Sequence, residues 1–258
     1  MLKGKKGVIF GIANDHSIAW GIAKKLSENG AELIITYQNE ILLKRVKPLS
    51  EKLNTILLIE CDFSKSESIK SSFKKIEDKH KKIDFVIHAA AFSDKNELNG
   101  KYLNTSKDNF INTLNISCYS FTEISKEASK IMNQGGSLLT LSFYGSNKVM
   151  PNYNVMGVAK AALETSVKYL SVDLGAQGIR VNALSAGPMR TIAGAAIANA
   201  REVYNYTQTN SALKRNVSLE ELGNTALYFV SDLSKSVTGE VHYVDCGFNI
   251  IGMPNSNN

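Results

Sequence analysis

Tyr153 and Lys160 have the residue types and the spacing of a proton-transfer pair. They are seven residues apart, which is two helical turns and places both side chains on one face of a helix. An ammonium group beside a phenol favours the phenolate, so we expect Lys160 to lower the pKa of Tyr153 below its usual value of about 10. A second tyrosine, Tyr144, shortly precedes the pair and is a further candidate. Chance could produce this spacing alone, so its meaning depends on the surrounding elements.

Apolar runs of strand length alternate with helical patterns along the chain. The strands lack polar alternation, which predicts a parallel sheet covered by helices on both faces. We therefore predict one α/β domain over residues 1–254, a Rossmann-like doubly wound parallel sheet of about seven strands, followed by a disordered tail at 255–258. The expected strands are 7–11, 32–37, 55–60, 83–88, 136–143, 178–184 and 241–245, and the expected helices are 17–30, 41–49, 69–76, 107–132, 152–176 and 219–230.

Composition excludes several classes of protein. Hydrophobic residues make up 43% and charged residues 21% of the 258, as in ordinary globular proteins. The net charge is +6, but Lys and Glu are dispersed, which indicates solvated helix faces and no nucleic-acid surface. No apolar run reaches the roughly 18 residues of a membrane helix, and the first ten residues lack a signal-peptide pattern. Cys61, Cys118 and Cys246 are widely spaced and predict free thiols and no metal site, so we expect a cytoplasmic protein.

The turn after the first strand, from Gly11 to Ala19, is where a dinucleotide pyrophosphate would lie, against the N-terminus of the next helix. The usual Gly-x-Gly-x-x-Gly fingerprint is missing. Ser17 is also a good N-cap residue, which is the structural alternative. His16 reads as a surface histidine of the loop.

Gln38 follows the second strand, where the adenosine ribose of a dinucleotide would lie. An acidic residue there is typical of NAD, and an arginine of NADP. Gln38 can bond hydroxyl groups and no basic residue adjoins it, which favours NADH. Asp62, after the third strand, places a carboxylate within reach of an adenine amino group. It can also cap the following helix, and the two roles are compatible.

Together these features resemble the short-chain dehydrogenase/reductase superfamily and, within it, the bacterial enoyl-[acyl-carrier-protein] reductases that use NADH. The similarity runs from about residue 3 to Met253. The motifs that carry it are Gly11-Ile-Ala-Asn-x-x-Ser17-Ile18-Ala19-Trp20-Gly21-Ile22-Ala23, His88-x-x-x-Phe92, Ser142-Phe-Tyr144-Gly, Pro151-Asn-Tyr153-Asn-Val-Met-Gly-x-Ala-Lys160, Ser185-Ala-Gly-Pro-x-Arg-Thr191 and Ser231-Asp-Leu-Ser to Gly239-Glu-Val-x-x-Val-Asp245.

The resemblance implies roles for matching positions. Tyr153 would bond the thioester carbonyl, Tyr144 would replace the serine of ordinary superfamily members, and Ser93 would lie near the substrate. Lys160 would bind the nicotinamide ribose. The other residues that would contact NADH are Gly11, Ser17, Ile18, Gln38, Asp62, Phe63, Ala90, Met189, Arg190, Thr191, Ile192 and Ala193.

Some positions depart from the family pattern. Ala91 stands where a glycine is common beside the nicotinamide and narrows that pocket, and Cys246 replaces another common glycine, which we expect to have no consequence. Of the basic residues that meet the acyl carrier protein in better-known members, Arg201 remains, while Ala198 and Glu202 occupy other such positions. The docking surface for the carrier protein is therefore open.

The implied activity is NADH-dependent reduction of the trans-2 double bond of an enoyl thioester carried by acyl carrier protein, in the last step of the type II fatty acid elongation cycle. The final proton could come from a tyrosine or from water. The segment 191–200 is small and apolar, so we expect a lid over the acyl chain near 191–210, with an ordinary buried helix as the alternative. The resemblance also implies a homotetramer, and apolar residues on the 152–176 helix and in 248–253 suit burial between subunits; the alternative is that the chain's own neighbours cover them.

Two alternatives remain open. A carbonyl reductase, such as a 3-ketoacyl reductase, would use the same fold, and Ser142 and Thr140 keep this possible. A non-catalytic cofactor sensor is the other, although a sensor has no need of the Tyr153/Lys160 pair. Comparing NADH oxidation with crotonyl and acetoacetyl thioesters separates all three.

Overall fold

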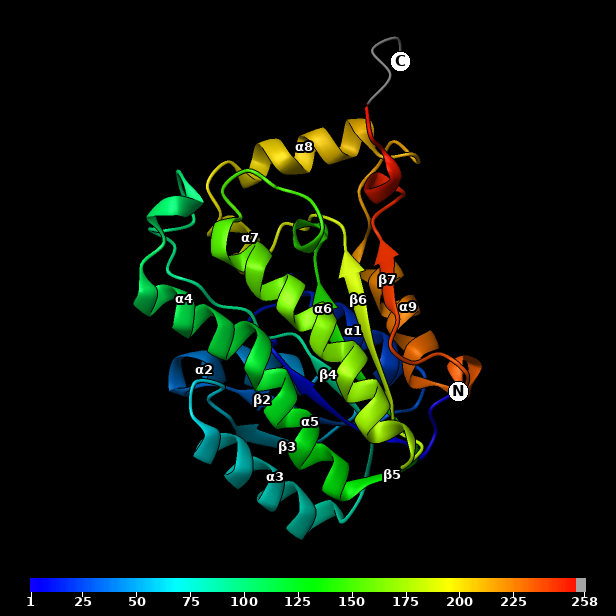
Figure 1. The fold of residues 1–258 in the computed structure, drawn as a ribbon. Coiled ribbons are helices and arrows are strands. Elements are labelled where there is room, and N and C mark those ends of the chain that lie inside the picture. The colour runs from blue at the N-terminus through cyan, green and yellow to red at the C-terminus, as the bar shows by residue number, and fades with distance from the viewer. Residues whose placement is uncertain (254–258) are drawn as a thin grey trace.

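The computed structural model describes residues 1–253, so the expected tail at 255–258 lies outside the described residues. Seven parallel strands form one sheet in the order β3-β2-β1-β4-β5-β6-β7 (Figure 1). This confirms the predicted fold class. The strands are β1 (Lys6–Phe10), β2 (Glu32–Tyr37), β3 (Thr55–Glu60), β4 (Ile83–His88), β5 (Met132–Ser142), β6 (Arg180–Ala186) and β7 (Val241–Val244).

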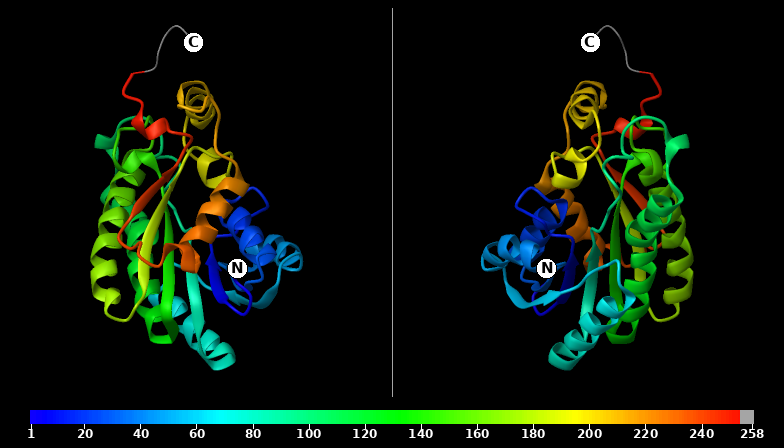
Figure 2. Two further views of the ribbon diagram at one scale, coloured as in Figure 1. Left: turned by 90° about the vertical axis from the view of Figure 1, so that its right-hand side faces the viewer. Right: turned by 90° about the vertical axis from the view of Figure 1, so that its left-hand side faces the viewer.

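Helices cover both faces of the sheet, as the continuous apolar strands predict (Figure 2). The side chains of α1, α2 and α9 pack on one face, and those of α3, α5 and α6 on the other. The helices are α1 (Ile18–Glu28), α2 (Glu40–Ser50), α3 (Ser66–His80), α4 (Lys107–Leu114), α5 (Ser120–Ile131), α6 (Asn154–Gly175), α7 (Ile192–Ala195), α8 (Ala200–Asn210) and α9 (Leu219–Val230).

Strand β1 shows how the sequence builds the two-sided core. Successive strand residues point to opposite faces, so Val8 and Phe10 pack on the α3/α5/α6 side and Ile9 packs on the α1/α9 side. All three are fully buried. Because both faces need apolar side chains, the strand shows no polar alternation.

The expected long helix at 107–132 is interrupted. A π-helical turn at Asn115–Tyr119 separates α4 from α5. Within it, the Ser117 hydroxyl accepts a hydrogen bond from the amide of Phe92 (2.9 Å) and donates one to the carbonyl of Phe92 (3.0 Å). The wide turn thus fixes the segment that follows β4, and the hydrophobic periodicity of the sequence gives no sign of it.

The carboxyl ends of the strands converge on one edge of the molecule, where α7 and α8 follow β6 (yellow in Figure 1). In a doubly wound sheet, this edge is where ligands bind. Among the described residues, no helix is long and apolar enough to cross a membrane.

Candidate active site

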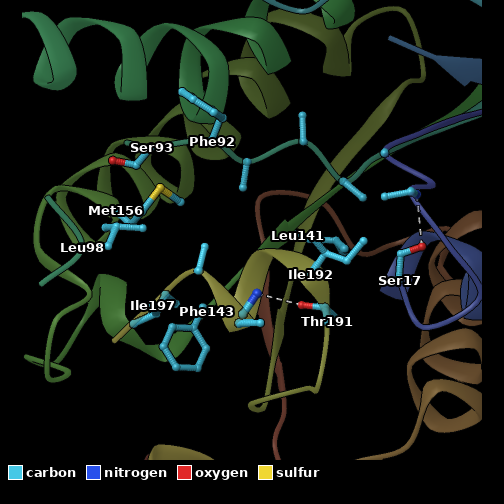
Figure 3. A pocket seen from close by; sticks show the side chains of 18 of the residues that line it. Ser17, Phe92, Ser93, Leu98, Leu141, Phe143, Met156, Thr191, Ile192 and Ile197 are labelled. Atoms are coloured by element: carbon cyan, nitrogen blue, oxygen red, sulfur yellow. Dashed lines mark hydrogen bonds between the residues drawn. The ribbon is translucent and has the colours of Figure 1, made fainter. Parts of the chain in front are cut away.

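A cavity of about 1990 Å³ lies at the carboxyl ends of the strands. It extends from the β1–α1 turn, marked by Ser17, to an apolar group around Phe143 (Figure 3). Most of the residues predicted from the sequence line it. They are Gly11, Ser17, Ile18, Gln38, Phe63, Ala90, Ser93, Tyr153, Lys160, Met189, Arg190, Thr191 and Ile192.

Gly11 is required by the close approach of the first turn to β4. Its φ is +98°, and a Cβ atom there would stand 2.3 Å from the carbonyl oxygen of Ala89. A side chain at this position is therefore excluded by both strain and space. The absence of a Cβ leaves the backbone open at the mouth of the cavity, where a dinucleotide needs close contact.

Ser17 occupies the N-cap position of α1 but makes no side-chain capping bond. Its hydroxyl instead turns back into the loop, accepting from the amides of Ala13 (3.3 Å) and Asn14 (3.4 Å) and donating to the carbonyl of Asn14. The capping alternative for Ser17 is thus wrong in its side-chain detail. The N–H groups of the first turn of α1 remain without a side-chain cap, next to a cavity wall that includes Ile18 and Ala19.

Gln38 and Asp62 are joined by a hydrogen bond of 3.3 Å. Gln38 lines the cavity, and Asp62 is not among the lining residues. Burial raises the pKa of Asp62, but hydrogen bonds from Ser64 and Gln38 outweigh this and lower it below its ordinary value. The carboxylate therefore carries its charge behind Gln38 and orients the amide. It does not cap α3, whose N-cap residue is Lys65.

Tyr153 is 7% exposed and stands in the last position before α6. Its ring lies edge-on to that of Phe143, with the centroids 4.9 Å apart. Gly145 closes against the same ring, because a Cβ atom on that glycine would stand 2.4 Å from it. The side chain is thus enclosed by its neighbours on two sides.

The expected lowering of the Tyr153 pKa is wrong. Burial, with the negative charge of Glu164 adding to it, raises the pKa of the phenol above its ordinary value. Desolvation penalises the phenolate, and Lys160 is not among the groups that offset this. The phenol is therefore protonated at neutral pH and is a donor.

Lys160 is buried, with 5% of its surface exposed. Its ammonium group donates a hydrogen bond to the carbonyl oxygen of Leu141 at 2.8 Å, near the end of β5. Burial lowers the pKa of Lys160 to about 8, although Cys118 and Glu164 act in the opposite direction. The Lys160 side chain is therefore positively charged at neutral pH but loses its proton more readily than an ordinary lysine.

Tyr144 is not among the residues that line the cavity. It is half-buried in a short turn after β5, and its ring lies edge-on to that of Phe248 with the centroids 5.6 Å apart. The structure thus brings Tyr153 and Lys160 to one cavity and leaves Tyr144 beside it. Ser142 does line the cavity, but its hydroxyl donates to Glu164 at 2.5 Å, as does that of Ser146 at 2.6 Å.

The loop after β6 forms one wall. Thr191 accepts a hydrogen bond from the amide of Gly194 (2.9 Å, dashed in Figure 3), which starts α7. Arg190 stacks on the ring of Tyr204 in α8, with its guanidinium carbon 4.4 Å from the ring centroid. Ala193 lies in α7, and its side chain is outside the part of the chain that the structure describes.

Ser93 lines the cavity, but its hydroxyl is hydrogen-bonded to side chains of α4. It accepts hydrogen bonds from Thr113 (3.0 Å) and Asn109 (3.1 Å). At the end of β4, the buried ring of His88 is hydrogen-bonded to Thr140 and Ser120. Burial, with the charge of Lys160, lowers the pKa of His88 to about 3, so this histidine is neutral and structural.

Sequence reasoning missed several lining residues. An apolar group of Leu98, Met156, Phe143, Met150 and Ile197 packs around Tyr153. Phe143 and Met156 lie inside the motifs around Tyr144 and Tyr153, and Ile197 lies inside the expected lid, but no pattern in the sequence marks Leu98 or Met150. Arg45 of α2 also lines the cavity, and for this residue the sequence does carry a signal, because Lys44 and Arg45 lie one to two helical turns after Gln38, where a basic residue would meet a phosphate on the adenosine ribose.

A comparison with known families decides the class. The profile described as "Enoyl-(Acyl carrier protein) reductase" matches residues 11–249. The chain belongs to this enoyl-(acyl carrier protein) reductase family. It is 57% identical to "Enoyl-[acyl-carrier-protein] reductase [NADH] 2" of Rhizobium meliloti (strain 1021), over 98% of this chain and 95% of the relative.

Solved structures of the enoyl reductase family agree with this. An Anaplasma phagocytophilum enoyl-(acyl-carrier-protein) reductase in complex with NAD superposes with a TM-score of 0.95 at 52% identity, covering 99% of this chain and 96% of that one. The Bacillus cereus enoyl-acyl carrier protein reductase with NADP+ and indole naphthyridinone gives 0.95 at 43% identity, covering 98% and 99%. The predicted family membership is thereby confirmed.

Proposed function

We propose that this chain is an NADH-dependent enoyl-[acyl-carrier-protein] reductase, which reduces the trans-2 double bond of enoyl thioesters in the last step of the fatty acid elongation cycle. One observation carries the proposal beyond family membership. The buried phenol of Tyr153 and the buried ammonium of Lys160 line the same cavity as the β1–α1 turn. A dinucleotide bound along that turn thus shares one cavity with a proton donor and a cation.

The residues present fit a dinucleotide. Gly11 leaves the backbone accessible, and the first turn of α1 has N–H groups free for a pyrophosphate, with Ser17 and Ile18 beside them. Gln38, oriented by Asp62, would bond the adenosine ribose, with Phe63 and Ala90 on the same cavity wall. Lys160 would bind the nicotinamide ribose, and the loop from Met189 to Ala193 would hold the nicotinamide.

Bound NADH supplies a hydride to the β-carbon of the enoyl thioester. Negative charge then develops on the thioester oxygen, and the protonated phenol of Tyr153 would donate a hydrogen bond to that oxygen. A positioned donor of this kind contributes about 2.7–4 kcal/mol to transition-state stabilisation. Lys160 would stabilise the same charge electrostatically. Tyr144, which lies outside the cavity lining, would need to turn from Phe248 to reach the substrate.

The acyl chain would lie against the apolar group around Tyr153, and the segment 191–210 would form a lid over it. Both would belong to a single domain that spans residues 1–254. Ile197, in that segment, packs with Leu98 and Met156 (Figure 3). Ile192 is 49% exposed at the edge of the cavity. Apolar side chains half exposed on a short helix are suited to closing over an apolar ligand.

The test is NADH oxidation by the full chain with crotonyl thioester and, separately, with acetoacetyl thioester. We expect turnover with the first only. Ser142, which a carbonyl reductase would use, already donates its hydroxyl to Glu164. Turnover with acetoacetyl thioester alone would indicate the carbonyl reductase, and turnover with neither would indicate a sensor. NADPH in place of NADH tests the reading of Gln38, with Lys44 and Arg45 as the residues that would accept a phosphate.

The proposal includes acyl carrier protein as partner, a cytoplasmic location and a homotetramer. Tyr169 and Val172 on α6 are 72% and 79% exposed, and Ile250 and Met253 are 73% and 89% exposed, which suits burial between subunits. Val167 and Phe248, in contrast, are covered by the chain itself. Light scattering at micromolar concentration tests this, and a mass near the 28.2 kDa of one chain would contradict it.

A further inference from the structure

Tyr153 is flanked by two asparagines with left-handed backbone conformations. The φ angle is +61° at Asn152 and +43° at Asn154, whereas Tyr153 between them has the ordinary value of −72°. Residues other than glycine adopt positive φ rarely, and asparagine does so most readily. The chain therefore makes two unusual turns on either side of the proposed proton donor.

Both side chains use these turns to reach the loop at 97–100. Asn152 accepts a hydrogen bond from the amide of Gly100 (3.1 Å). Asn154 donates to the carbonyl of Glu97 (3.1 Å) and, at 3.4 Å, to that of Gly100. Leu98, in the middle of this loop, packs in the same apolar group as Tyr153. The loop is thus tied to the backbone on both sides of the tyrosine.

Asn152 also reaches the 191–210 segment. Its amide nitrogen donates to the carbonyl of Ala198 at 3.0 Å. The amide of Ala198 in turn donates to the carbonyl of Leu98 at 3.1 Å. Three segments distant in sequence therefore meet at one side chain, which bonds the loop with its oxygen and the 191–210 segment with its nitrogen.

We infer that Asn152 and Asn154 are positioning residues for Tyr153, and that Asn152 couples the placement of the phenol to closure of the 191–210 segment. This inference rests on the proposed function. With the segment closed, Ala198 and Gly100 hold the Asn152 amide from opposite sides and so fix the backbone that carries the tyrosine. When it opens, Asn152 loses one of its two partners and Tyr153 loses part of its support.

The test uses substitutions that separate the hydrogen bonds from the backbone. Asn152→Gly keeps the positive φ without strain and removes both bonds. Asn152→Asp keeps the acceptor for Gly100 and removes the donor to Ala198. Asn154→Gly removes the contacts with the loop and leaves Ala198 untouched. Lys81→Gly is the matched control, because Lys81 has the same φ of +61° at an exposed position at the end of α3.

We expect Asn152→Gly to lower kcat with crotonyl thioester about tenfold, the cost of two ordinary hydrogen bonds. The dissociation constant of NADH, measured by calorimetry, should stay within about twofold of the wild type, since a side chain that only positions Tyr153 does not bind cofactor. Hydrogen–deuterium exchange in 191–210 should accelerate in Asn152→Gly and Asn152→Asp, but not in Asn154→Gly. Asn154→Gly should lower kcat without changing hydrogen–deuterium exchange in 191–210.

A kcat for Asn152→Gly equal to that of Lys81→Gly would overturn the inference. So would an NADH affinity that falls in parallel with kcat, because that indicates a general scaffold defect. If Asn152→Gly does not fold, Asn152→Asp carries the test through its exchange rate and KM. If wild-type protein does not reduce crotonyl thioester, the proposed function fails, whereas the exchange comparison still decides whether Asn152 holds the segment.

Discussion

The two sides of the cavity are built differently. The wall with Tyr153 and Lys160 is enclosed by the sheet and α6, and these side chains are 7% and 5% exposed. The 191–210 segment is a short helix followed by α8, in which the described buried residue is Thr207. Its contacts with the rest of the cavity include the packing of Ile197 on the apolar group around Tyr153, the hydrogen bonds of Ala198 with Leu98 and Asn152, and the stack of Arg190 on Tyr204.

The difference assigns separate tasks to the two sides. Burial fixes the groups that act on charge, and burial also sets their protonation states, because desolvation raises the pKa of Tyr153 and lowers that of Lys160. The 191–210 segment has few buried apolar contacts, which is typical of elements that open locally at low cost. We therefore expect substitutions in the wall to reduce chemistry, and substitutions in the segment to change mainly substrate affinity.

The largest effect is expected for Lys160→Met. It removes a buried cation that would both bind the nicotinamide ribose of NADH and stabilise the negative charge on the thioester oxygen. We expect kcat/KM to fall about a thousandfold and NADH binding to weaken as well, because the ribose contact is lost. Calorimetry with NADH and steady-state kinetics with crotonyl thioester measure the two losses. Unchanged affinity for NADH would contradict the assignment of Lys160 to the ribose.

The pH dependence of NADH binding tests the same residue. Because the pKa of Lys160 is lowered to about 8, the ammonium loses its proton as pH rises through about 8. Affinity for NADH should therefore fall above that pH. Lys160→Arg retains its charge over this range and serves as the control, since it should show a flat profile. If wild type and Lys160→Arg showed the same pH profile, a group other than Lys160 would be responsible for the pH dependence of NADH binding.

Tyr153→Phe is expected to lower kcat by a factor of about 10² to 10³, with NADH affinity close to that of the wild type. The ring and its contact with Phe143 remain, and only the donor is lost. Single-turnover reduction in a stopped-flow instrument gives the chemical rate directly. Full turnover by this variant would remove Tyr153 from the mechanism.

The sequence predicted the fold because each strand is a continuous apolar run between helical patterns. It predicted most of the cavity through the motifs around Gly11, Tyr153 and Thr191. It did not predict the interrupted helix at Asn115–Tyr119, because a π-helical turn leaves the apolar periodicity readable as one helix. The predicted direction of the pKa shift of Tyr153 was also wrong, because the spacing of residues in the sequence shows a neighbouring charge but not the extent of burial.

Cys246 illustrates a second kind of miss. We expected no consequence of cysteine in place of glycine, but its φ is +58°, a conformation that disfavours residues with a Cβ atom. Tyr144 illustrates a third kind, because its motif is intact and yet its ring packs on Phe248 outside the cavity lining. Backbone conformation and side-chain direction depend on tertiary contacts that a single sequence does not show.

Arg190→Ala tests the side of the cavity formed by the 191–210 segment. It removes the stack on Tyr204, an interaction worth about 0.5–1 kcal/mol when partly exposed. We expect KM for crotonyl thioester to rise a few-fold and kcat to change little. Tyr204→Leu should give the same result, since it removes the other partner. A loss confined to kcat would show that the segment takes part in chemistry.

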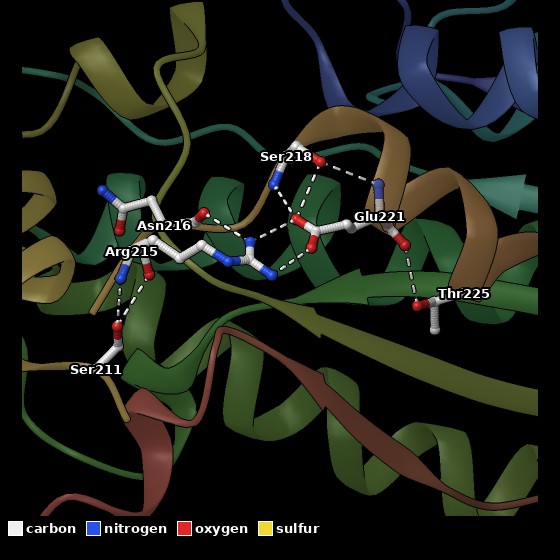
Figure 4. Close-up of polar contacts among 6 residues, drawn as sticks. All are labelled: Ser211, Arg215, Asn216, Ser218, Glu221 and Thr225. Carbon is white, nitrogen blue, oxygen red and sulfur yellow. Dashed lines mark hydrogen bonds and ion pairs between the residues drawn. The ribbon is translucent and has the colours of Figure 1, made fainter. Parts of the chain in front are cut away.

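The smallest effect is expected beyond α8, where the chain is anchored to α9 (Figure 4). Arg215 forms two bonds with Glu221, at 2.9 and 2.6 Å, and Glu221 also accepts the backbone amide of Ser218 at 2.8 Å in a capping box. The bond from Arg215 is the main cause that lowers the pKa of Glu221 to about 2. The side chains of Arg215 and Glu221 are 49% and 36% exposed, so solvent screens the pair.

Glu221→Gln should therefore cost about 1 kcal/mol or less in the free energy of unfolding at pH 7, because glutamine can keep the capping contact while the charge is lost. Glu221 has a lower pKa in the folded chain than its ordinary value of 4.5, so its contribution is complete above pH 4.5 and is lost as pH falls toward 2. Urea unfolding between these values should show the stability difference between wild type and variant shrinking. Ser218→Ala keeps the ion pair and removes only the weaker hydroxyl contribution to the lowered pKa of Glu221, so its stability difference should depend less on pH. Neither variant should alter kcat, since neither residue lines the cavity. A fall in kcat would show that the contact between Arg215 and Glu221 influences catalysis.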